Sequence, residues 1–181
     1  MAASPSSGAA NVRPATVDDA AAIAAVNVTS WRAAYAGIVR DAELAALSGG
    51  ERRDRWERLL AGGGQVCVAE RDGEICGYVA FGSDHGRDPT AGEVYALYVD
   101  PASWNVGLGR QLLATALAEL AATGRTRTVL WTLASNARAR RFFESAGFAA
   151  DGAERPWQAG VITLTELRYT RTLLAAPSPT P

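Results

Sequence analysis

The stretch from Glu93 to Arg110 constrains the fold of this chain more than any other segment, because it predicts a strand, a tight turn and a helix in succession. It reads EVYALYVDPASWNVGLGR. The first seven residues are rich in β-branched and aromatic side chains, and Asp100-Pro101 ends the strand. Gly107-Leu108-Gly109 then opens a long segment with the apolar periodicity of a helix. The sequence therefore predicts an α/β fold built around a strand-to-helix crossover.

The two glycines at the start of this helix also favour an anion site. Without Cβ atoms in the way, several free backbone N–H groups can approach a phosphate, and the helix dipole adds positive potential there. A Gly-x-Gly pair by itself is a weak signal, since many helices begin near glycine for packing reasons alone. Phosphate binding and simple packing both remain open for Gly107 and Gly109.

The rest of the chain predicts alternating strands and helices. The predicted strands are 12–15, 65–70, 74–82, 93–99, 128–133, a poorly patterned one within 148–157, and 161–172. The predicted helices are one that follows a cap at 16–19 and runs past residue 31, then 41–47, 51–61, 107–123 and 136–146. Because the helices from Gly107 and Asn136 connect strands by crossovers while other strands pair as hairpins, we expect a mixed sheet with helices on both faces.

Length and charge limit the classes of function. A chain of 181 residues that is 48% hydrophobic suits one domain with a substantial core. Its 18 basic and 19 acidic residues give a net charge of -1, so no general field favours nucleic acid or an anionic membrane. No apolar run approaches a membrane span and no secretory signal is evident, so we expect a cytoplasmic protein. The small polar tails, 1–10 and 175–181, should be disordered around one domain at 11–174.

Cysteine and histidine usage argues against a disulfide and a metal site. Cys67 and Cys76 flank a predicted hairpin turn centred on Asp72-Gly73, on the same sheet face but not directly opposite, so we expect reduced thiols. No Cys and His spacing typical of metal ligands occurs, and the single His85 lies in a polar loop. We therefore expect no zinc or iron site.

Four stretches, in the predicted order of elements, resemble the GCN5-related N-acetyltransferase (GNAT) superfamily. The first strand and bent helical region of that family resemble VRPATVDDAAAIAAVNVTSWRAAYAGI, and its acetyl-CoA pyrophosphate motif resembles LYVDPASWNVGLGRQLL. Its helix over the thiol end of the cofactor is similar to NARARRFFESAGF, and its final strand to ELRYTRTL. The resemblance covers about Val12 to Leu173. It implies a single-domain GNAT fold with a mostly antiparallel sheet, and an N-acetyltransferase with acetyl-CoA as co-substrate.

The resemblance also implies how the cofactor would be held. In the family, the strand that corresponds to 93–100 diverges from its neighbour, and backbone groups from Leu97 through Tyr98 to Val99 would hold the pantetheine arm there. Backbone amides would surround the pyrophosphate, and those amides belong to Asn105, Val106, Gly107, Leu108, Gly109 and Arg110. The remaining implied contacts are Asn136 for the pantetheine arm, and Ala139, Phe142 and Phe143 as the wall at the thiol end.

Two departures from the family's pattern stand out. Trp104 lies three residues before the first glycine, where Gln or Arg is usual, and we expect it to change side-chain contacts more than binding by the backbone. Phe143 stands where many members have a tyrosine that is thought to protonate the leaving thiolate, and a phenyl ring has no proton to give. Arg138 or Arg140 would either approach the adenosine phosphates or remain solvated at the surface.

Acetyl transfer from a thioester to an amine needs a neutral amine and a donor for the charge that grows on the carbonyl oxygen. An amine with a pKa of about 10.4 is roughly 99.9% protonated at neutral pH, so a proton acceptor is required. Glu93 is our candidate, directly or through water. Strand alternation predicts that it shares a face with Tyr95 and Leu97 near the slot, and Val99 continues that face. The alternative is that Glu93 is an exposed residue at the start of the strand. The backbone N–H of Leu97 would receive the oxyanion.

The group that protonates the leaving thiolate stays open among Tyr95, Tyr98, Ser135 and water. Ser135 is equally suited to cap the following helix. Thiolates leave readily without a proton, since their pKa is about 8.5. With Phe143 at this position no acid can be assigned there, but catalysis remains possible.

The acceptor pocket would draw on Asn27, Trp31, Tyr35 and Trp157, although each is equally suited to core packing. Their aromatic character suits a small apolar or cationic amine. The sequence does not choose among amino acids, antibiotics, polyamines and protein termini. It also leaves a homodimer open, since dimers are common in the superfamily.

The expected reaction is direct transfer of acetyl to a primary amine of a small molecule or peptide, without a covalent enzyme intermediate. A non-catalytic acyl-CoA-binding module is the alternative, motivated by Phe143. A dinucleotide oxidoreductase is disfavoured, because Leu112 stands where its fingerprint requires a third glycine.

Overall fold

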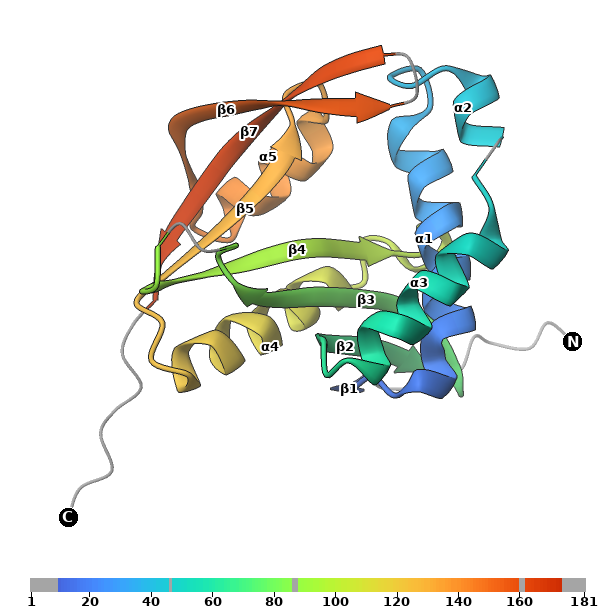
Figure 1. The fold of residues 1–181 in the computed structure, drawn as a ribbon, viewed down its shortest axis with the longest axis horizontal. Helices are drawn as coiled ribbons and strands as arrows, with labels where there is room; N and C mark the ends of the chain where they lie inside the picture. The colour runs from blue at the N-terminus through green and yellow to red at the C-terminus, as the bar shows by residue number, and fades with distance from the viewer. Residues whose placement is uncertain (1–9, 46, 86–87, 160–161, 174–181) are drawn as a thin grey trace, which may run out of the picture.

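A computed structural model describes residues 10–45, 47–85, 88–159 and 162–173 (Figure 1). Its strands are β1 (Asn11–Pro14), β2 (Gln65–Arg71), β3 (Glu74–Ser83), β4 (Ala91–Val99), β5 (Arg127–Leu133), β6 (Ala149–Ala159) and β7 (Ile162–Thr172). Its α-helices are α1 (Ala20–Tyr35), α2 (Asp41–Ala45), α3 (Gly49–Ala61), α4 (Leu108–Ala122) and α5 (Ala137–Ser145). The tails predicted at 1–10 and 175–181 lie outside the described residues, apart from Ala10.

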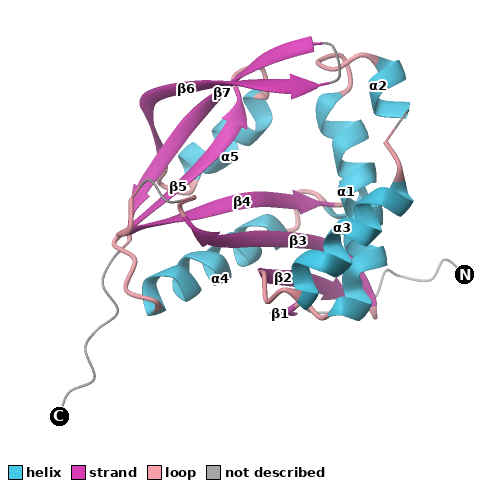
Figure 2. Ribbon diagram, in the orientation of Figure 1, coloured by secondary structure: helices cyan, strands magenta, loops and turns pink. Residues whose placement is uncertain are grey.

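The strands form one sheet in the order β1-β2-β3-β4-β5-β7-β6. Only β4 and β5 pair in parallel, and α4 is the crossover between them. The other neighbours are antiparallel. Helices α1 and α3 cover one face, while α4 and α5 cover the other (Figures 1 and 2). This confirms the predicted mixed, mostly antiparallel sheet with helices on both faces.

The sheet separates between β4 and β5, and this separation positions the site. The two strands pair only along 91–94 and 127–130. Beyond Val94 they diverge, so the rest of β4 lies apart from β5, as the ribbons show (Figure 2). The α4 face of the core is filled by apolar residues of the helix, including Leu112 and Leu120, which are at most 2% exposed.

A β-bulge in β4 changes which face Glu93 occupies. Phe81 of β3 pairs with Val94, whereas the residue before it, Ala80, pairs with Ala96. Tyr95 is therefore the extra residue on β4, and it reverses the alternation on its N-terminal side. Val94 packs in the α4-side core. Glu93 consequently lies on the α1 side, opposite to Leu97 and Val99, and the predicted sharing of one face was wrong.

The N-terminal strand is tied to the first helix by an ion-pair network. The Arg13 guanidinium bonds Asp19 at 2.7 Å and Glu70 at 3.0 Å. Because Arg13 donates to it, the pKa of Asp19 falls from its ordinary 3.8 to about 2. The backbone N–H of Thr16 also donates to Asp19 at 2.8 Å. The network joins β1, β2 and the start of α1.

Both cysteines are free thiols, as predicted, and both lie in the core on the α4 side. Burial raises the pKa of Cys67 and of Cys76. None of the described helices combines the length and the apolarity that a bilayer crossing requires. Within the described ranges, no three His, Cys, Asp or Glu side chains gather as a metal-binding group.

Candidate active site

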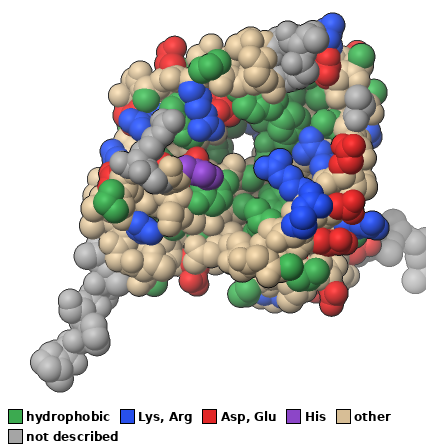
Figure 3. Space-filling view, viewed as in Figure 1, with side chains coloured by type: hydrophobic (Ala, Val, Ile, Leu, Met, Phe, Trp, Pro, Cys, Tyr) green, Lys and Arg blue, Asp and Glu red, His purple; other side chains and the backbone are tan. Residues whose placement is uncertain are grey.

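A cavity of about 1270 Å³ occupies the gap between β4 and β5. Its walls come from α1 and α3 on one side of the sheet, and from the start of α4 and from α5 on the other. The space-filling view shows the hollow lined by apolar side chains, with the background visible through its centre (Figure 3). The cavity thus passes through the sheet. All of the predicted site residues line it except Glu93, Val106, Ser135 and Arg140.

The turn into α4 presents a run of backbone N–H groups. The amides of 105–109 donate to no acceptor among the described residues, while those of Arg110 and Gln111 both donate to the Gly107 carbonyl at 3.1 Å. Gly107 has φ 90° and Asn105 has φ 63°, so the chain turns sharply here. Such a run of unpaired donors at a helix N-terminus can bind a phosphate or a pyrophosphate.

The edge of β4 supplies a second set of free backbone groups. The Asp100 N–H donates to a β3 carbonyl at 2.8 Å, so alternation directs the N–H groups of Leu97 and Val99 to the opposite edge, where β5 has diverged. The carbonyl of Val99 already accepts from Ser30 at 3.0 Å and from the Trp104 ring at 2.7 Å. What remains free for an extended ligand is the backbone of Leu97 and the Val99 N–H.

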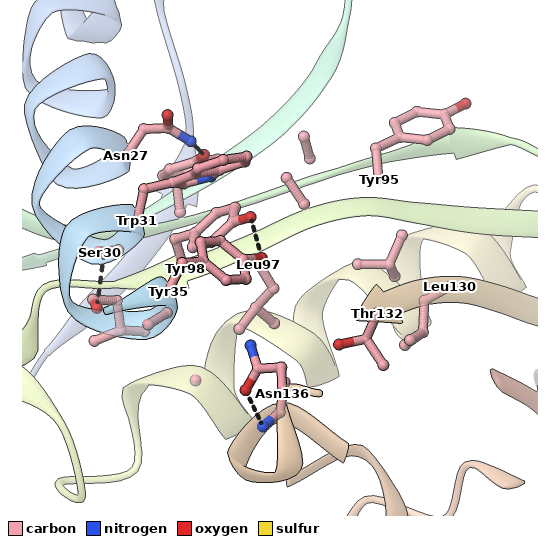
Figure 4. Close-up of a pocket in the computed structure, with 18 of the residues that line it drawn as sticks. Asn27, Ser30, Trp31, Tyr35, Tyr95, Leu97, Tyr98, Leu130, Thr132 and Asn136 are labelled. Atoms are coloured by element: carbon pink, nitrogen blue, oxygen red, sulfur yellow. Dashed lines mark hydrogen bonds between the residues drawn. The ribbon is translucent and has the colours of Figure 1, made fainter. Parts of the chain in front are cut away.

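Helix α5 closes the other side of this slot. Its cap is Asn136, whose side-chain oxygen accepts from the Ala139 N–H at 3.0 Å. The side-chain nitrogen of Asn136 points toward Leu97 (Figure 4). Ser135, the alternative cap, is exposed and does not cap the helix.

Two aromatic rings of α5 form part of the cavity wall. Phe142 and Phe143 both line it, with ring centroids 5.2 Å apart. Phe143 is only 8% exposed and packs on Phe148. A Cβ added at Gly109 would lie 3.4 Å from the Phe142 ring, in ordinary van der Waals contact, so α5 lies directly beside the N–H run.

Trp104 and Arg138 form a stacked pair beside that run. The Arg138 guanidinium carbon lies 3.4 Å from the Trp104 ring centroid, and both residues line the cavity. Burial lowers the pKa of Arg138. Arg140 instead donates to the Tyr169 hydroxyl and to the Ala134 carbonyl, each at 3.1 Å. Of the two arginines, only Arg138 is available to a ligand in the cavity.

Glu93 reaches the cavity through a histidine. Glu93 is only 6% exposed, and its carboxylate lies 3.0 Å from Nδ1 of His85. The His85 ring lines the cavity and meets the ring of Tyr95 edge-on, with centroids 4.8 Å apart. Tyr95 donates to the Ser83 carbonyl and points away from Leu97 and Asn136 (Figure 4). The acid and the histidine form a pair that the sequence did not indicate.

On the α1 side, an aromatic wall bounds the cavity. Trp31 lies edge-on to Tyr35, with centroids 4.7 Å apart, and 5.3 Å from Trp157 of β6. The structure therefore brings these predicted acceptor residues together from two ends of the chain. The Tyr98 hydroxyl is 3.3 Å from that of Tyr35 (Figure 4). Burial raises the pKa of both phenols.

The role of Tyr98 in the cofactor slot stays a prediction. Alternation turns its backbone toward β3, and its side chain extends into the acceptor side. Asn27 is also more than a wall residue. It is buried, donates to the Tyr78 hydroxyl and accepts from Arg52.

Arg52 is the second residue that the sequence did not single out. It is one of four arginines in α3, and the sequence pattern alone gives no means to choose among them. The packing of α3 on α1 brings Arg52 to the cavity, where its guanidinium carbon lies 5.1 Å from the Trp31 ring centroid. The signal for His85 was only that it is the single histidine in the chain.

The comparison with protein families gives one clear match. A model described as the acetyltransferase (GNAT) family matches residues 29–148. An uncharacterized N-acetyltransferase, YuaI of Bacillus subtilis (strain 168), is 34% identical over 131 residues, which cover 69% of this chain and 72% of that protein. A probable N-acetyltransferase of Mycobacterium tuberculosis, Rv2775, is 30% identical over 81% of this chain and 84% of its own.

Solved structures share the same architecture. A putative acetyltransferase of Salmonella typhimurium, yncA, determined with its cofactor acetyl-CoA, superimposes with a TM-score of 0.69 at 28% identity. The match covers 95% of this chain and 98% of that one. The likeness extends over the sheet and its helices, and so includes the elements that form the cavity.

Proposed function

The chain belongs to the acetyltransferase (GNAT) family, and from this premise we propose that it transfers acetyl from acetyl-CoA to a primary amine by direct attack, without a covalent enzyme intermediate. The acceptor would be a small molecule or peptide, and one catalytic domain at 11–174 would perform the reaction in the cytoplasm. The observation that carries the proposal is the junction of two donor sets at one cavity: the free edge of β4 and the unpaired amides of 105–109.

These donor sets fit the two polar parts of acetyl-CoA. The amides of 105–109 would bind the pyrophosphate, with Arg138 beside them on Trp104. The Leu97 carbonyl, the Val99 N–H and the side-chain nitrogen of Asn136 would pair with amides of the pantetheine arm. When bound, acetyl-CoA supplies an acetyl group activated as a thioester. Phe142 and Phe143 would shield that end from water.

The acceptor amine would lose its proton to the Glu93 and His85 pair. His85 lines the cavity and would take the proton, directly or through water, while Glu93 orients the ring. The N–H of Leu97 would donate to the thioester carbonyl oxygen as charge grows there. Both roles use groups that face the cavity.

The leaving thiolate would depart without a dedicated acid from the protein. Phe143 has no proton, Tyr95 donates to a backbone carbonyl, and Ser135 is exposed. A thiol has a pKa of about 8.5, so its anion leaves without prior protonation, and water can protonate it afterwards.

Two measurements test the proposal. Calorimetry should show that coenzyme A binds, and a free-thiol assay with acetyl-CoA and a panel of primary amines should show release that depends on the amine. The chain has no lysine, so thiol release without added amine reports hydrolysis rather than acetylation of lysine side chains. Tight binding with no amine-dependent release across the panel would favour an acyl-CoA-binding module instead. Absence of binding would refute both.

A further inference from the structure

The acceptor side of the cavity contains a charged group that neither the transfer chemistry nor the cofactor requires. Arg52 lies on α3, lines the cavity and is half-buried. One of its N–H groups donates to the Asn27 side chain, and its guanidinium stacks over Trp31 at 5.1 Å. Asn27 is itself anchored by donating to Tyr78. The guanidinium is thus held in place by neutral partners on two sides.

No carboxylate of the described residues forms an ion pair with Arg52. Of the other cavity residues, Arg55 adds positive charge, Glu166 is paired with Arg155 at 2.6 Å, and Glu51 is exposed. Partial burial and, to a smaller extent, the charge of Arg55 lower the pKa of Arg52. A guanidinium has five N–H donors, and Asn27 takes one of them. The others can still bind an anion.

This arrangement discriminates between classes of amine. A polyamine or another polycation would bring like charge against Arg52 and Arg55, which opposes binding. An amine that also carries a carboxylate would place opposite charge there, and the planar fork of a guanidinium matches the two oxygens of a carboxylate. The aromatic wall of Trp31, Tyr35 and Trp157 suits an apolar side chain between the two ends of the acceptor.

We propose that Arg52 is the acceptor-specificity residue of this protein, and that it binds the carboxylate of a small amino acid whose amine is acetylated. Asn27 and Trp31 position the guanidinium for that contact. Acetylation of the amine rests on the proposed function, but the contact between Arg52 and the carboxylate can be measured without turnover.

The test uses matched acceptors that differ only in the carboxylate. Phenylalanine, phenylalaninamide and phenethylamine form one set, and leucine, leucinamide and isoamylamine form another. Calorimetry of each compound with the full chain saturated with coenzyme A reads binding without turnover. We expect the acid of at least one set to bind about 10- to 100-fold more tightly than its amide and its amine. The same preference should appear in kcat/KM with acetyl-CoA.

Two variants connect that preference to the residue. Arg52→Gln should reduce the ratio of the affinity for the acid to the affinity for its amide to about one. Arg52→Lys should retain part of the preference for the acid, because the charge remains. Arg53→Gln is the matched control: Arg53 is on the same helix, exposed, paired with Asp54 and Glu57, and away from the cavity. It should leave the ratio unchanged. Unaltered affinity for coenzyme A and unaltered circular dichroism establish that each variant folds.

The outcomes separate the two proposals. Acids that bind no better than their amides, or a preference that survives Arg52→Gln, would overturn the role of Arg52 even if amines are acetylated. A carboxylate preference that depends on Arg52 without any thiol release would support it while refuting the transfer reaction. Tighter binding of O-phosphoethanolamine than of β-alanine would overturn the assignment of a carboxylate in favour of a phosphate.

Discussion

At the scale of single residues, this protein places its polar side chains so that one orients the next. Glu93 contacts His85, and His85 faces the cavity. In the same way Asn27 holds Arg52. The sequence indicated Glu93 and Asn27, which are the buried members of these pairs, but it did not indicate the partners. These partners depend on how the loop that contains His85 and the helix α3 pack against the rest of the fold. The local residue pattern does not predict that packing.

Removing the charge of Glu93 should lower turnover without lowering cofactor affinity. We expect Glu93→Gln and His85→Gln each to reduce kcat by about 10²- to 10⁴-fold, since each removes the proton acceptor or its orientation. The coenzyme A affinity measured by calorimetry should stay within about twofold. Because the residues act as one unit, the double variant should be little worse than either single one. Additive losses would show that the two residues act separately, and unchanged turnover of both would remove the pair from the mechanism.

Asp19 should make stability depend on pH in acid. Its pKa is about 2 in the folded protein and about 3.8 when unfolded, so its contribution is present above about pH 4 and is lost as the pH falls through 2. We expect Asp19→Asn to lower the free energy of unfolding by about 1 to 2 kcal/mol at pH 7, and by less near pH 2. Urea denaturation at several pH values measures both.

The exposed neighbour Asp18 provides the control for that series, because Asp18→Asn removes the same charge outside the Arg13 network. It should change stability by less than about 0.5 kcal/mol at any pH. A gap between Asp19→Asn and the parent protein that stays constant down to pH 2 would contradict the assignment.

At the scale of elements, periodicity and turn residues predicted the fold well. Strands 65–70 and 74–82, the helix after Gly107 and the helix closed by Gly147 all occur within a few residues of the predicted limits. The face of Glu93 was missed because the bulge at Tyr95 has no glycine or proline to indicate it, and a single extra residue reverses the alternation. The separation of β4 from β5 came from the family resemblance, since both strands have ordinary strand patterns.

The N-terminus of α4 provides a sharp test of cofactor binding. Gly109→Glu places bulk and negative charge at the unpaired amides, so we expect coenzyme A affinity to fall at least about 100-fold. Gly109→Ala should have a smaller effect, because it adds no charge and its Cβ would make an ordinary van der Waals contact with the Phe142 ring at 3.4 Å. Calorimetry measures both affinities.

The control for this helix is Ala118→Glu, which adds the same charge at an exposed position about two and a half turns further along α4. It should bind coenzyme A like the parent protein. If Gly109→Glu also bound normally while remaining folded by circular dichroism, the pyrophosphate would have to bind elsewhere.

At the scale of the whole molecule, the sheet consists of two parts, β1–β4 and β5–β7, joined by a short parallel contact and by α4. The cavity lies between the parts, and its walls come from both. A ligand in the slot adds contacts exactly where the sheet lacks hydrogen bonds. Binding should therefore stabilise the junction more than the rest of the fold.

Hydrogen exchange can locate that stabilisation. With saturating coenzyme A, we expect slower exchange of the amides at 95–99 and 105–109, and little change in β1 and β2, which contribute no residue to the cavity. The global free energy of unfolding should rise by about 2.7 kcal/mol at a ligand concentration 100 times the Kd. Protection spread evenly over the sheet, or confined to β1 and β2, would contradict the position of the slot.

The cavity passes through the sheet, and this affects how substrates enter and products leave. Amides for the cofactor lie toward α4 and α5, while the aromatic wall and Arg52 lie toward α1 and α3. Because the cavity opens on both sides of the sheet, each reactant can enter from its own side without the other leaving first. Spent coenzyme and acylated product can likewise depart independently, and the meeting point in the middle is the only place that they share.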